Sequence, residues 1–468
     1  MNLSRRHFLK TAGAISLGFT GLQTLIGRNG FAAPSLSEMP YGFGDLVRDP
    51  DQILDLPKGF SYRLFSRAGT KMDDGFFVPT LHDGMAAFPG PGGKTVLVRN
   101  HEVGELKREQ GPFGEENKEL ARLPRELIYD PGKEEGPSLG GTTTLVYDTK
   151  AGRLEKHYLS LVGTVRNCAG GPTPWNTWIS CEETILVEDE IRARDHGYNF
   201  EVPATADGGV AKPVPLRAMG RFTHEAVAVD PRSGVVYQTE DVQDGLIYRF
   251  IPDEPGNLAA GGKLQALAVR DHPSLDMRNW DNPNRVPVGT RFQTYWVDLE
   301  DVESPNNDLR YQGFDRGAAR FSREEGMWYG RRAVYFASSD GGHAKKGQIW
   351  RYKPSPFEGD EREERFPGKL ELFIEPNDGG LVENCDNVTV APWGDLILCE
   401  DGVEDNYLVG VTPAGEIYKF GRHALLGSEL AGATFSPDGS TLFVNLQHRG
   451  FSVAITGPWH SRLPRLQR

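Results

Sequence analysis

One cysteine and a series of carboxylates recur in this sequence at a regular spacing. In the stretch RNCAGGPTPWNTWISCEE, from Arg166 to Glu183, Cys168 opens a short segment that ends on acidic residues. Five other stretches follow the same plan, in which a polar or small residue opens a strand, a turn follows, and a second strand ends on a polar, usually acidic, residue. The six opening residues are Asp83, Cys168, Glu225, Glu325, Asp386 and Gly432, and the six closing residues are Glu102, Glu182, Glu240, Asp340, Glu400 and Gln447.

The spacing of these stretches predicts six antiparallel hairpins. The opening and closing residues are separated by 19, 14, 15, 15, 14 and 15 residues, and glycine-bearing turns such as Trp393-Gly394 and Asp438-Gly439 lie near the middle of several stretches. The first and last residues of a hairpin lie at the same end of it. Six hairpins arranged radially predict an all-β fold, a six-bladed β-propeller, with the opening and closing residues gathered at one mouth of the central channel.

A mouth lined by so many carboxylates indicates a polynuclear metal site, because the charges would otherwise repel one another in a partly desolvated space. A thiolate with carboxylates suits iron(III), and carboxylate oxygens suit calcium. Arg323, two residues before Glu325, offers a planar donor fork that fits phosphate. Taken singly, a strand-end carboxylate is usually a solvated turn residue, and Cys168 could be an inert buried thiol. The candidate metal ligands are Cys168, Glu102, Glu182, Glu225, Glu325 and Asp386.

The N-terminus predicts export. Residues 4–10, SRRHFLK, precede a weakly hydrophobic run and the segment FAAP, which is typical of a twin-arginine signal cleaved near Ala32 or Ala33. We therefore expect a signal peptide over residues 1–33 and a single β-propeller domain over residues 34–468. The hydrophobic run is too short and too rich in glycine for a permanent membrane anchor. The expected partner is the twin-arginine translocation machinery, and the expected location is the periplasm or the medium.

The rest of the sequence bears on the binding partners, on the cysteines and on the insertions between the hairpins. A formal net charge of −13 argues against nucleic acid as a partner. Cys385 and Cys399 could face each other across a hairpin, so a disulfide between them is one possibility in an oxidising compartment. Residues 105–136, 186–219 and 252–317 are expected to be loop and helical insertions that cover one face and shape the entrance to the mouth.

Several ordered motifs resemble those of the PhoX-type alkaline phosphatases. They are the twin-arginine signal, VRNHE, NCAGGPTPWNTWISCEE, GRFTHEA, FSREEG, SSDGG, GQIW, CDN and WGDLILCED, and they extend over most of the chain. The resemblance implies a six-bladed propeller with an iron and calcium cluster that hydrolyses phosphate monoesters. It also implies that Cys168 is the thiolate ligand of iron, that Glu225 and Glu325 are cluster ligands, that Arg323 binds phosphate, and that Asn100 and Glu102 lie beside them.

The predicted function is that of a metal-dependent phosphatase acting on small phosphate esters, monoesters in particular. Arg323 and Asn100 are its candidate catalytic residues. One alternative is a calcium-dependent propeller lactonase, in which His82, His101 or His224 would act as acid or base. The other is a periplasmic propeller without enzymatic activity that binds a partner through its rim. Motifs for nucleotide binding and for serine hydrolases are absent from the sequence.

Overall fold

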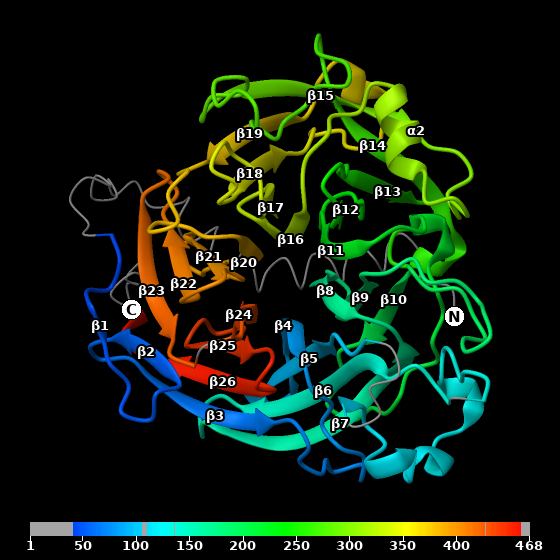
Figure 1. The fold of residues 1–468 in the computed structure, drawn as a ribbon, viewed down its shortest axis with the longest axis vertical. Coiled ribbons are helices and arrows are strands. Elements are labelled where there is room, and N and C mark those ends of the chain that lie inside the picture. Colours follow the sequence, from blue (N-terminus) through cyan, green and yellow to red (C-terminus); the bar gives the residue numbers. More distant parts are fainter. Residues whose placement is uncertain (1–40, 105–109, 135, 426, 460–468) are drawn as a thin grey trace.

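The regular secondary structure of the described residues consists almost entirely of β-strands, which are arranged around a centre (Figure 1). The computed structural model describes residues 41–104, 110–134, 136–425 and 427–459, so the predicted signal over residues 1–33 lies outside the described residues. Within those ranges, no helix has both the length and the apolar character needed to cross a bilayer. The predicted all-β fold is confirmed, and the arrangement of the sheets is propeller-like.

Three of the five sheets contain three or four strands. One is formed by β4 (His82–Pro89), β5 (Thr95–His101), β6 (Gly140–Asp148) and β7 (Arg153–Thr164). The next is formed by β8 (Asn167–Pro172), β9 (Thr177–Glu182) and β10 (Asn199–Pro203). The third is formed by β24 (Leu430–Phe435), β25 (Thr441–Leu446), β26 (Phe451–Thr456) and β3 (Ser61–Arg67). In this third sheet an early strand pairs with the last strand, which closes the ring.

The other two sheets are larger. The six-stranded sheet follows the order β1 (Leu46–Val47), β2 (Leu54–Pro57), β23 (Ile417–His423), β22 (Tyr407–Val411), β21 (Leu396–Glu400) and β20 (Cys385–Val390). The nine-stranded sheet follows the order β11 (His224–Val229), β12 (Val236–Glu240), β13 (Tyr248–Pro252), β14 (Gly262–Val269), β15 (Arg291–Asp298), β19 (Lys369–Ile374), β18 (Gln348–Lys353), β17 (Ala333–Ser338) and β16 (Glu324–Gly330). β15 joins two four-stranded units at their outer edges, because it pairs with both β14 and β19.

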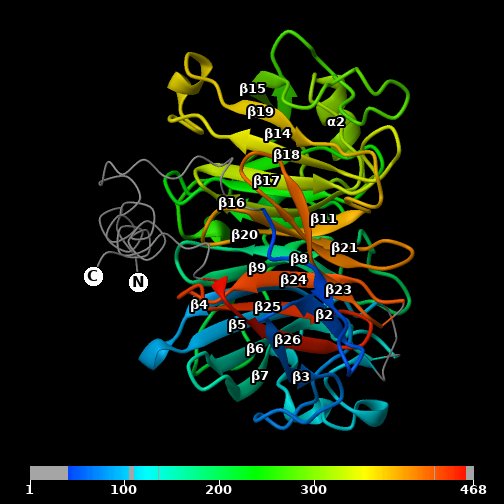
Figure 2. The same ribbon diagram turned by 90° about the vertical axis from the view of Figure 1, so that its left-hand side faces the viewer.

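Six inner strands form a continuous ring around the centre. They are β4, β8, β11, β16, β20 and β24, and each contacts the next around the ring (Figure 1). Each inner strand forms an antiparallel hairpin with the strand that follows it. All six predicted hairpins are therefore present. In side view the sheets form successive layers, with β14, β15 and α2 at one end and β3 and β7 at the other (Figure 2).

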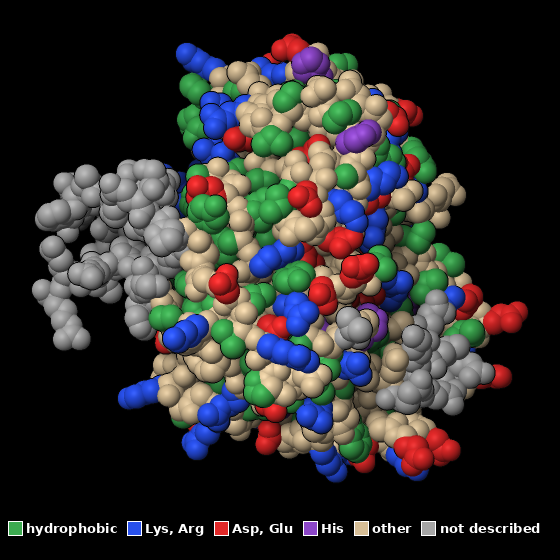
Figure 3. All heavy atoms as spheres, turned by 60° about the vertical axis from the view of Figure 1, so that its left-hand side comes forward, with side chains coloured by type: hydrophobic (Ala, Val, Ile, Leu, Met, Phe, Trp, Pro, Cys, Tyr) green, Lys and Arg blue, Asp and Glu red, His purple; other side chains and the backbone are tan. Residues whose placement is uncertain are grey.

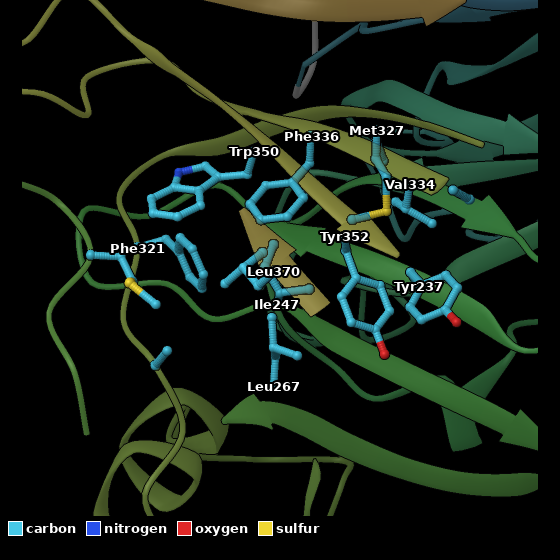
Figure 4. Packing of buried hydrophobic residues seen from close by; sticks show 14 of the residues in the cluster. Tyr237, Ile247, Leu267, Phe321, Met327, Val334, Phe336, Trp350, Tyr352 and Leu370 are labelled. Atoms are coloured by element: carbon cyan, nitrogen blue, oxygen red, sulfur yellow. The ribbon is translucent and has the colours of Figure 1, made fainter. Parts of the chain in front are cut away.

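The core lies between neighbouring sheets and between the two four-stranded units of the nine-stranded sheet. In the largest hydrophobic cluster, Trp350 packs against Phe321 and Phe336, while Tyr237 and Tyr352 lie edge to face (Figure 4). Each large apolar side chain buried in this way stabilises the fold by roughly 2 kcal/mol. Packing of this kind fixes the relative positions of the inner strands and hence of the residues at their ends.

The segments expected to be insertions contain more regular structure than predicted. Residues 186–219 contain β10, which pairs with β9, and residues 252–317 contain β14, β15 and the helix α2 (Leu309–Asp315). They continue existing sheets, since β10 pairs with β9 and β14 pairs with both β13 and β15. Short 3-10 turns are η2 (Pro91–Gly93), η4 (Glu115–Asn117), η5 (Leu120–Arg122), η6 (Arg125–Leu127), η7 (Arg217–Met219), η8 (Leu258–Ala260) and η9 (Glu361–Glu364). The four cysteines are buried and free, so Cys385 and Cys399 form no disulfide.

Candidate metal centre

A polar cavity of about 340 Å³ lies where the inner strands begin. Its charged and sulfur-bearing lining residues are Glu102, Glu183, Glu225, Asp241, Glu325, Asp386, Asp401, Glu429, Arg166, Arg323, His448 and Cys168. Beyond the cavity the inner strands are packed closely: a Cβ atom at Gly84 would lie 2.6 Å from the Cα of Ala169, and one at Gly326 would lie 2.7 Å from the Cα of Asn387. The cavity is therefore closed at its inner end by the backbone itself.

A β-bulge recurs at the start of every inner strand. The pairing register shifts between His82 and Met85, Asn167 and Gly170, His224 and Val227, Glu324 and Met327, Cys385 and Val388, and Ala431 and Thr434. A bulge sets two residues of one strand against one of its partner and turns a side chain away from the regular pleat. In all six strands the predicted opening residue lies at the bulge, and in five of them it is a potential ligand: Asp83, Cys168, Glu225, Glu325 or Asp386. The bulges thus place the candidate ligands at the mouth.

The same end of each hairpin is closed by one repeated backbone hydrogen bond. The residue that follows the second strand donates its N–H to a carbonyl just before the inner strand. The acceptor lies two residues before the opening residue in the pairs Glu102 to Leu81, Glu183 to Arg166, Asp241 to Thr223, Ser339 to Arg323 and Asp401 to Asn384, and three residues before it in the pair Gln447 to Glu429. Four of these accepting residues have left-handed backbones, with φ of 48° at Leu81, 50° at Arg166, 48° at Arg323 and 47° at Asn384. This conformation costs roughly 1 kcal/mol for a residue other than glycine. Closing the hairpins at the mouth therefore requires a strained backbone at these four residues.

Cys168 lies among carboxylates rather than in the apolar core. Its Sγ is 3.1 Å from Oε1 of Glu225 and 3.8 Å from Oδ2 of Asp83. Burial raises the pKa of the Cys168 thiol, and the charges of Asp83 and Glu225 raise it further. A cation bound beside the sulfur would reverse that effect, because it favours the thiolate.

Potential ligand atoms gather in three overlapping groups, in each of which they lie within 4.8 Å of one another. The groups are Asp83, Glu102 and Cys168; Cys168, Glu183 and Glu225; and Glu225, Glu325 and Asp386. Cys168 and Glu225 each belong to two groups, so the three groups form one continuous chain of donors. Such an arrangement can hold several cations that share ligands.

The carboxylates of this chain of donors carry strongly perturbed pKa values. Burial raises the pKa of Asp386 to about 7, with Asp401 adding to the effect. Burial also raises the pKa values of Glu225 and Glu325 well above their ordinary range, and nearby carboxylates raise them further. Oε2 of Glu225 forms no hydrogen bond with any residue that the structure describes. These sulfur and carboxylate donors suit metal cations, and bound cations would neutralise their buried negative charge.

Two arginines lie beside the carboxylates. Nη2 of Arg166 is 3.0 Å from Oε1 of Glu102 and 2.6 Å from Oε2 of Glu183. Arg323 donates from Nε and Nη2 to the two oxygens of Asp241, each at 3.0 Å, and its Nη2 is also 3.0 Å from Oε1 of Glu325. Both arginine side chains remain partly exposed, at 46% for Arg166 and 40% for Arg323. Each can therefore meet a ligand that enters the cavity.

Glu182 is not part of the cavity, which corrects its prediction as a metal ligand. Its carboxylate accepts hydrogen bonds from the backbone N–H groups of Val165, Gly197 and Tyr198, and Nδ1 of His196 lies 2.6 Å from Oε1. Adjacent residues at the end of a strand point in different directions. The next residue, Glu183, lines the cavity instead.

The same shift of one residue applies to two more hairpins. Asp241 and Asp401 line the cavity, whereas the predicted closing residues Glu240 and Glu400 do not. In each case two acidic residues stand side by side in the sequence, so residue type alone could not distinguish them. Glu429 and His448, which also line the cavity, were not predicted either. They belong to the last hairpin, whose opening residue is not acidic.

Asn100 does not reach the cavity, although it was predicted to be catalytic. Its side chain is completely buried, and its Nδ2 donates to the carbonyls of Cys168 and Ala169 at 3.1 and 2.6 Å. Its Oδ1 accepts from Nε1 of Trp178 and Oγ of Ser180. Asn100 therefore positions the backbone that carries Cys168. His82, His101 and His224, the candidate acid or base of a lactonase, are also buried and do not line the cavity.

Comparisons with known proteins indicate the family and the fold. The model of the family described as "Alkaline phosphatase PhoX" matches residues 41–450. No curated protein matches the sequence. The structure of Pseudomonas fluorescens PhoX in complex with vanadate, a transition state analogue, is similar with a TM-score of 0.63 and 19% identity, over 87% of this chain and 96% of that chain. The Xanthomonas campestris gluconolactonase XC5397 is similar with a TM-score of 0.40 and 12% identity, over 90% of this chain and 99% of that chain.

Proposed function

Because the chain belongs to the PhoX alkaline phosphatase family, and is thus an alkaline-phosphatase-type hydrolase, we propose that it hydrolyses phosphate esters, monoesters in particular, at an iron and calcium cluster in this cavity. The observation that carries the proposal is the position of the Cys168 sulfur, which belongs to two groups of donors within 4.8 Å of one another. A solvated acidic rim would not need a buried thiol at its centre. We also infer that the domain is a six-bladed propeller, with the nine-stranded sheet counting as two blades joined through β15.

We assign the metal ligands from the donor groups. Cys168, Glu225 and Glu325 are the proposed ligands of iron, because a thiolate and carboxylates together suit iron(III). Glu102 and Asp386 are proposed to hold calcium with the remaining carboxylate oxygens. Glu183 takes the place that the sequence suggested for Glu182. When bound, such a cluster supplies positive charge that stabilises a phosphoryl group and its leaving oxygen.

The side chains around the cluster bind and orient the substrate. The guanidinium of Arg323 presents a planar fork to the phosphate oxygens, and Asp241 fixes its orientation through two hydrogen bonds. The pKa of Arg323 is raised, chiefly by the charge of Glu325, so that it remains a cation at any pH at which the enzyme works. Arg166 supplies a second cation on the opposite acidic pair, Glu102 and Glu183. Anionic substrate is thus held by arginines within an otherwise acidic mouth.

The proposed activity is tested with the protein as purified. We expect iron and calcium to copurify with it and p-nitrophenyl phosphate to be hydrolysed faster than bis(p-nitrophenyl) phosphate. Vanadate, which the Pseudomonas fluorescens relative binds, should inhibit competitively. Calcium without iron, together with hydrolysis of a lactone and no hydrolysis of either phosphate ester, would support the lactonase alternative. If the protein contains neither iron nor calcium and hydrolyses neither phosphate esters nor a lactone, the result would support the binding-protein alternative.

The proposed domain limits and location rest on the N-terminal sequence. We propose that residues 1–33 direct export through the twin-arginine machinery and that residues 34–468 form one domain. Exchange of Arg5 and Arg6 for lysine should leave the precursor in the cytoplasm. Normal export of that variant would show that the signal is of another kind.

A further inference from the structure

A second group of buried oxygens lies beside the cavity, around Glu324 on β16. Glu324 precedes Glu325 in the sequence but does not line the cavity. Its side chain is completely buried, and neither carboxylate oxygen forms a hydrogen bond with any described residue. A buried carboxylate without a donor or a cation is strongly destabilising, so this group requires a partner.

The neighbouring strand presents two more unpartnered oxygens. Ser338 on β17 is the cross-strand partner of Glu324, and its Oγ is buried without a hydrogen bond in the described structure. Cross-strand neighbours have Cβ atoms about 5 Å apart. The hydroxyl nevertheless does not bond to the carboxylate, so both groups are left without a hydrogen-bond partner in the described structure. Oδ1 of Asp340, two residues further on, is likewise buried and without a hydrogen bond.

The segment after β12 forms the opposite wall. A Cβ atom at Gly245 would lie 2.1 Å from Oε2 of Glu324 and 2.6 Å from the carbonyl oxygen of Glu240. The absence of a side chain at Gly245 therefore allows the carboxylate to approach the backbone of this segment. The Glu240 carboxylate accepts a hydrogen bond from Tyr248 at 2.6 Å, and Nη1 of Arg310 lies 3.6 Å from its other oxygen. The same arginine is paired more closely with Asp244, whose Oδ1 lies 3.0 Å from its Nε.

We propose that the oxygens around Glu324 bind a calcium ion that is separate from the cavity. Calcium takes six to eight oxygen ligands in irregular geometry and accepts carboxylates, hydroxyls and backbone carbonyls. The unpartnered atoms here, from Glu324, Ser338 and Asp340, are all oxygens, which does not suit metals that prefer sulfur or nitrogen. The ion would tie the segment after β12 to the start of β16. It would thereby support the strand that carries Glu325.

Metal analysis of matched variants tests the proposal. Glu324→Gln keeps the shape of the side chain and removes its charge, and should lower the calcium content by one ion per chain relative to the parent. Glu358→Gln is the control, because Glu358 is also buried but is paired with Arg249 at 2.8 Å. It should keep the calcium content of the parent. Chelation should lower the melting temperature of the parent more than that of Glu324→Gln.

Two further variants separate this site from the cavity and from a failure to fold. Glu225→Gln alters the cavity and should leave the calcium bound at Glu324 in place. Asp340→Asn lies at the edge of the group and should weaken calcium binding at least tenfold even if Glu324→Gln does not fold. Parental calcium content and affinity in both the Glu324 and the Asp340 variants would overturn the proposal. It would mean that Glu324 is held as the neutral acid beside buried water.

Discussion

The buried histidine behind the mouth should make stability depend on alkaline pH. His196 is completely buried between two carboxylates, with Nδ1 2.6 Å from Glu182 and Nε2 3.2 Å from Asp130. Burial alone would lower the pKa of His196, but the charges and hydrogen bonds of Glu182 and Asp130 outweigh it and raise the pKa to about 9. In the unfolded chain an ordinary histidine has a pKa of about 6.5.

The size and sign of the effect follow from these two values. A difference of about 2.5 pKa units corresponds to roughly 3 kcal/mol of stability from the protonated form, at about 1.4 kcal/mol per unit. Because the folded-state pKa is the higher one, this stability is fully present below about pH 6.5 and is lost as the pH rises through 9. The free energy of unfolding contributed by His196 should therefore fall by roughly 3 kcal/mol between about pH 6 and pH 10.

The assay is urea denaturation of the parent and of His196→Gln across that range. The parent should exceed the variant in stability by roughly 3 kcal/mol more at about pH 6 than at about pH 10. The cavity carboxylates, which titrate in both proteins, cancel in this difference. His423→Gln is the control, since burial lowers the pKa of His423 to about 4 and keeps it neutral in the folded protein across this range. Because the unfolded chain then binds more protons at the lower pH, the stability that His423 contributes should not fall as the pH rises. A difference between parent and His196→Gln that stays constant with pH would refute the argument and indicate a neutral imidazole.

Four other substitutions distinguish ligands from supporting residues. Cys168→Ser should remove iron and lower phosphatase activity roughly 100-fold or more. Cys399 lies in an apolar cluster, so Cys399→Ser should keep the activity and lose roughly 1–3 kcal/mol of stability. Iron content and p-nitrophenyl phosphate hydrolysis are measured for both variants. Asn100→Ala should lower the melting temperature by removing roughly 2–4 kcal/mol, and a change in KM alone with unchanged stability would contradict its role beneath Cys168. Arg323→Lys keeps the charge but loses the fork and should raise KM roughly tenfold, so an unchanged KM would place phosphate elsewhere.

The repeated hairpins were predictable because they combine two regular signals, strand length and the spacing of acidic residues. Cys168, Glu225, Glu325 and Asp386 were identified in this way, since each opens a hairpin and each lies at a bulge beside the cavity. The closing residues were harder to identify. The residue that lines the cavity is Glu183 rather than Glu182, and because both are acidic, the sequence does not show which of the two it is.

The supporting residues could not be recognised from sequence for a different reason. Asn100 stands in a polar motif next to Glu102, and only the packing of β5 against β8 turns its amide toward the backbone of Cys168. The strands β10 and β15 were taken for insertions. β15 pairs with β19, where Arg291 lies opposite Glu371, and these segments are far apart in the sequence. Such contacts leave no periodic signal in the sequence itself.

The pairing of β3 with β26 has a consequence for the order of events during synthesis. β3 leaves the ribosome early, and its partner leaves near the end, so β3 keeps an open edge until almost the whole chain has been made. The mouth shares this dependence, because Gln447 from the last hairpin donates to Asp83 at 2.7 Å and to Glu102 at 2.8 Å, both from the first hairpin. Closure of the ring by the last hairpin therefore also completes the hydrogen bonds that hold Asp83 and Glu102 in place at the mouth.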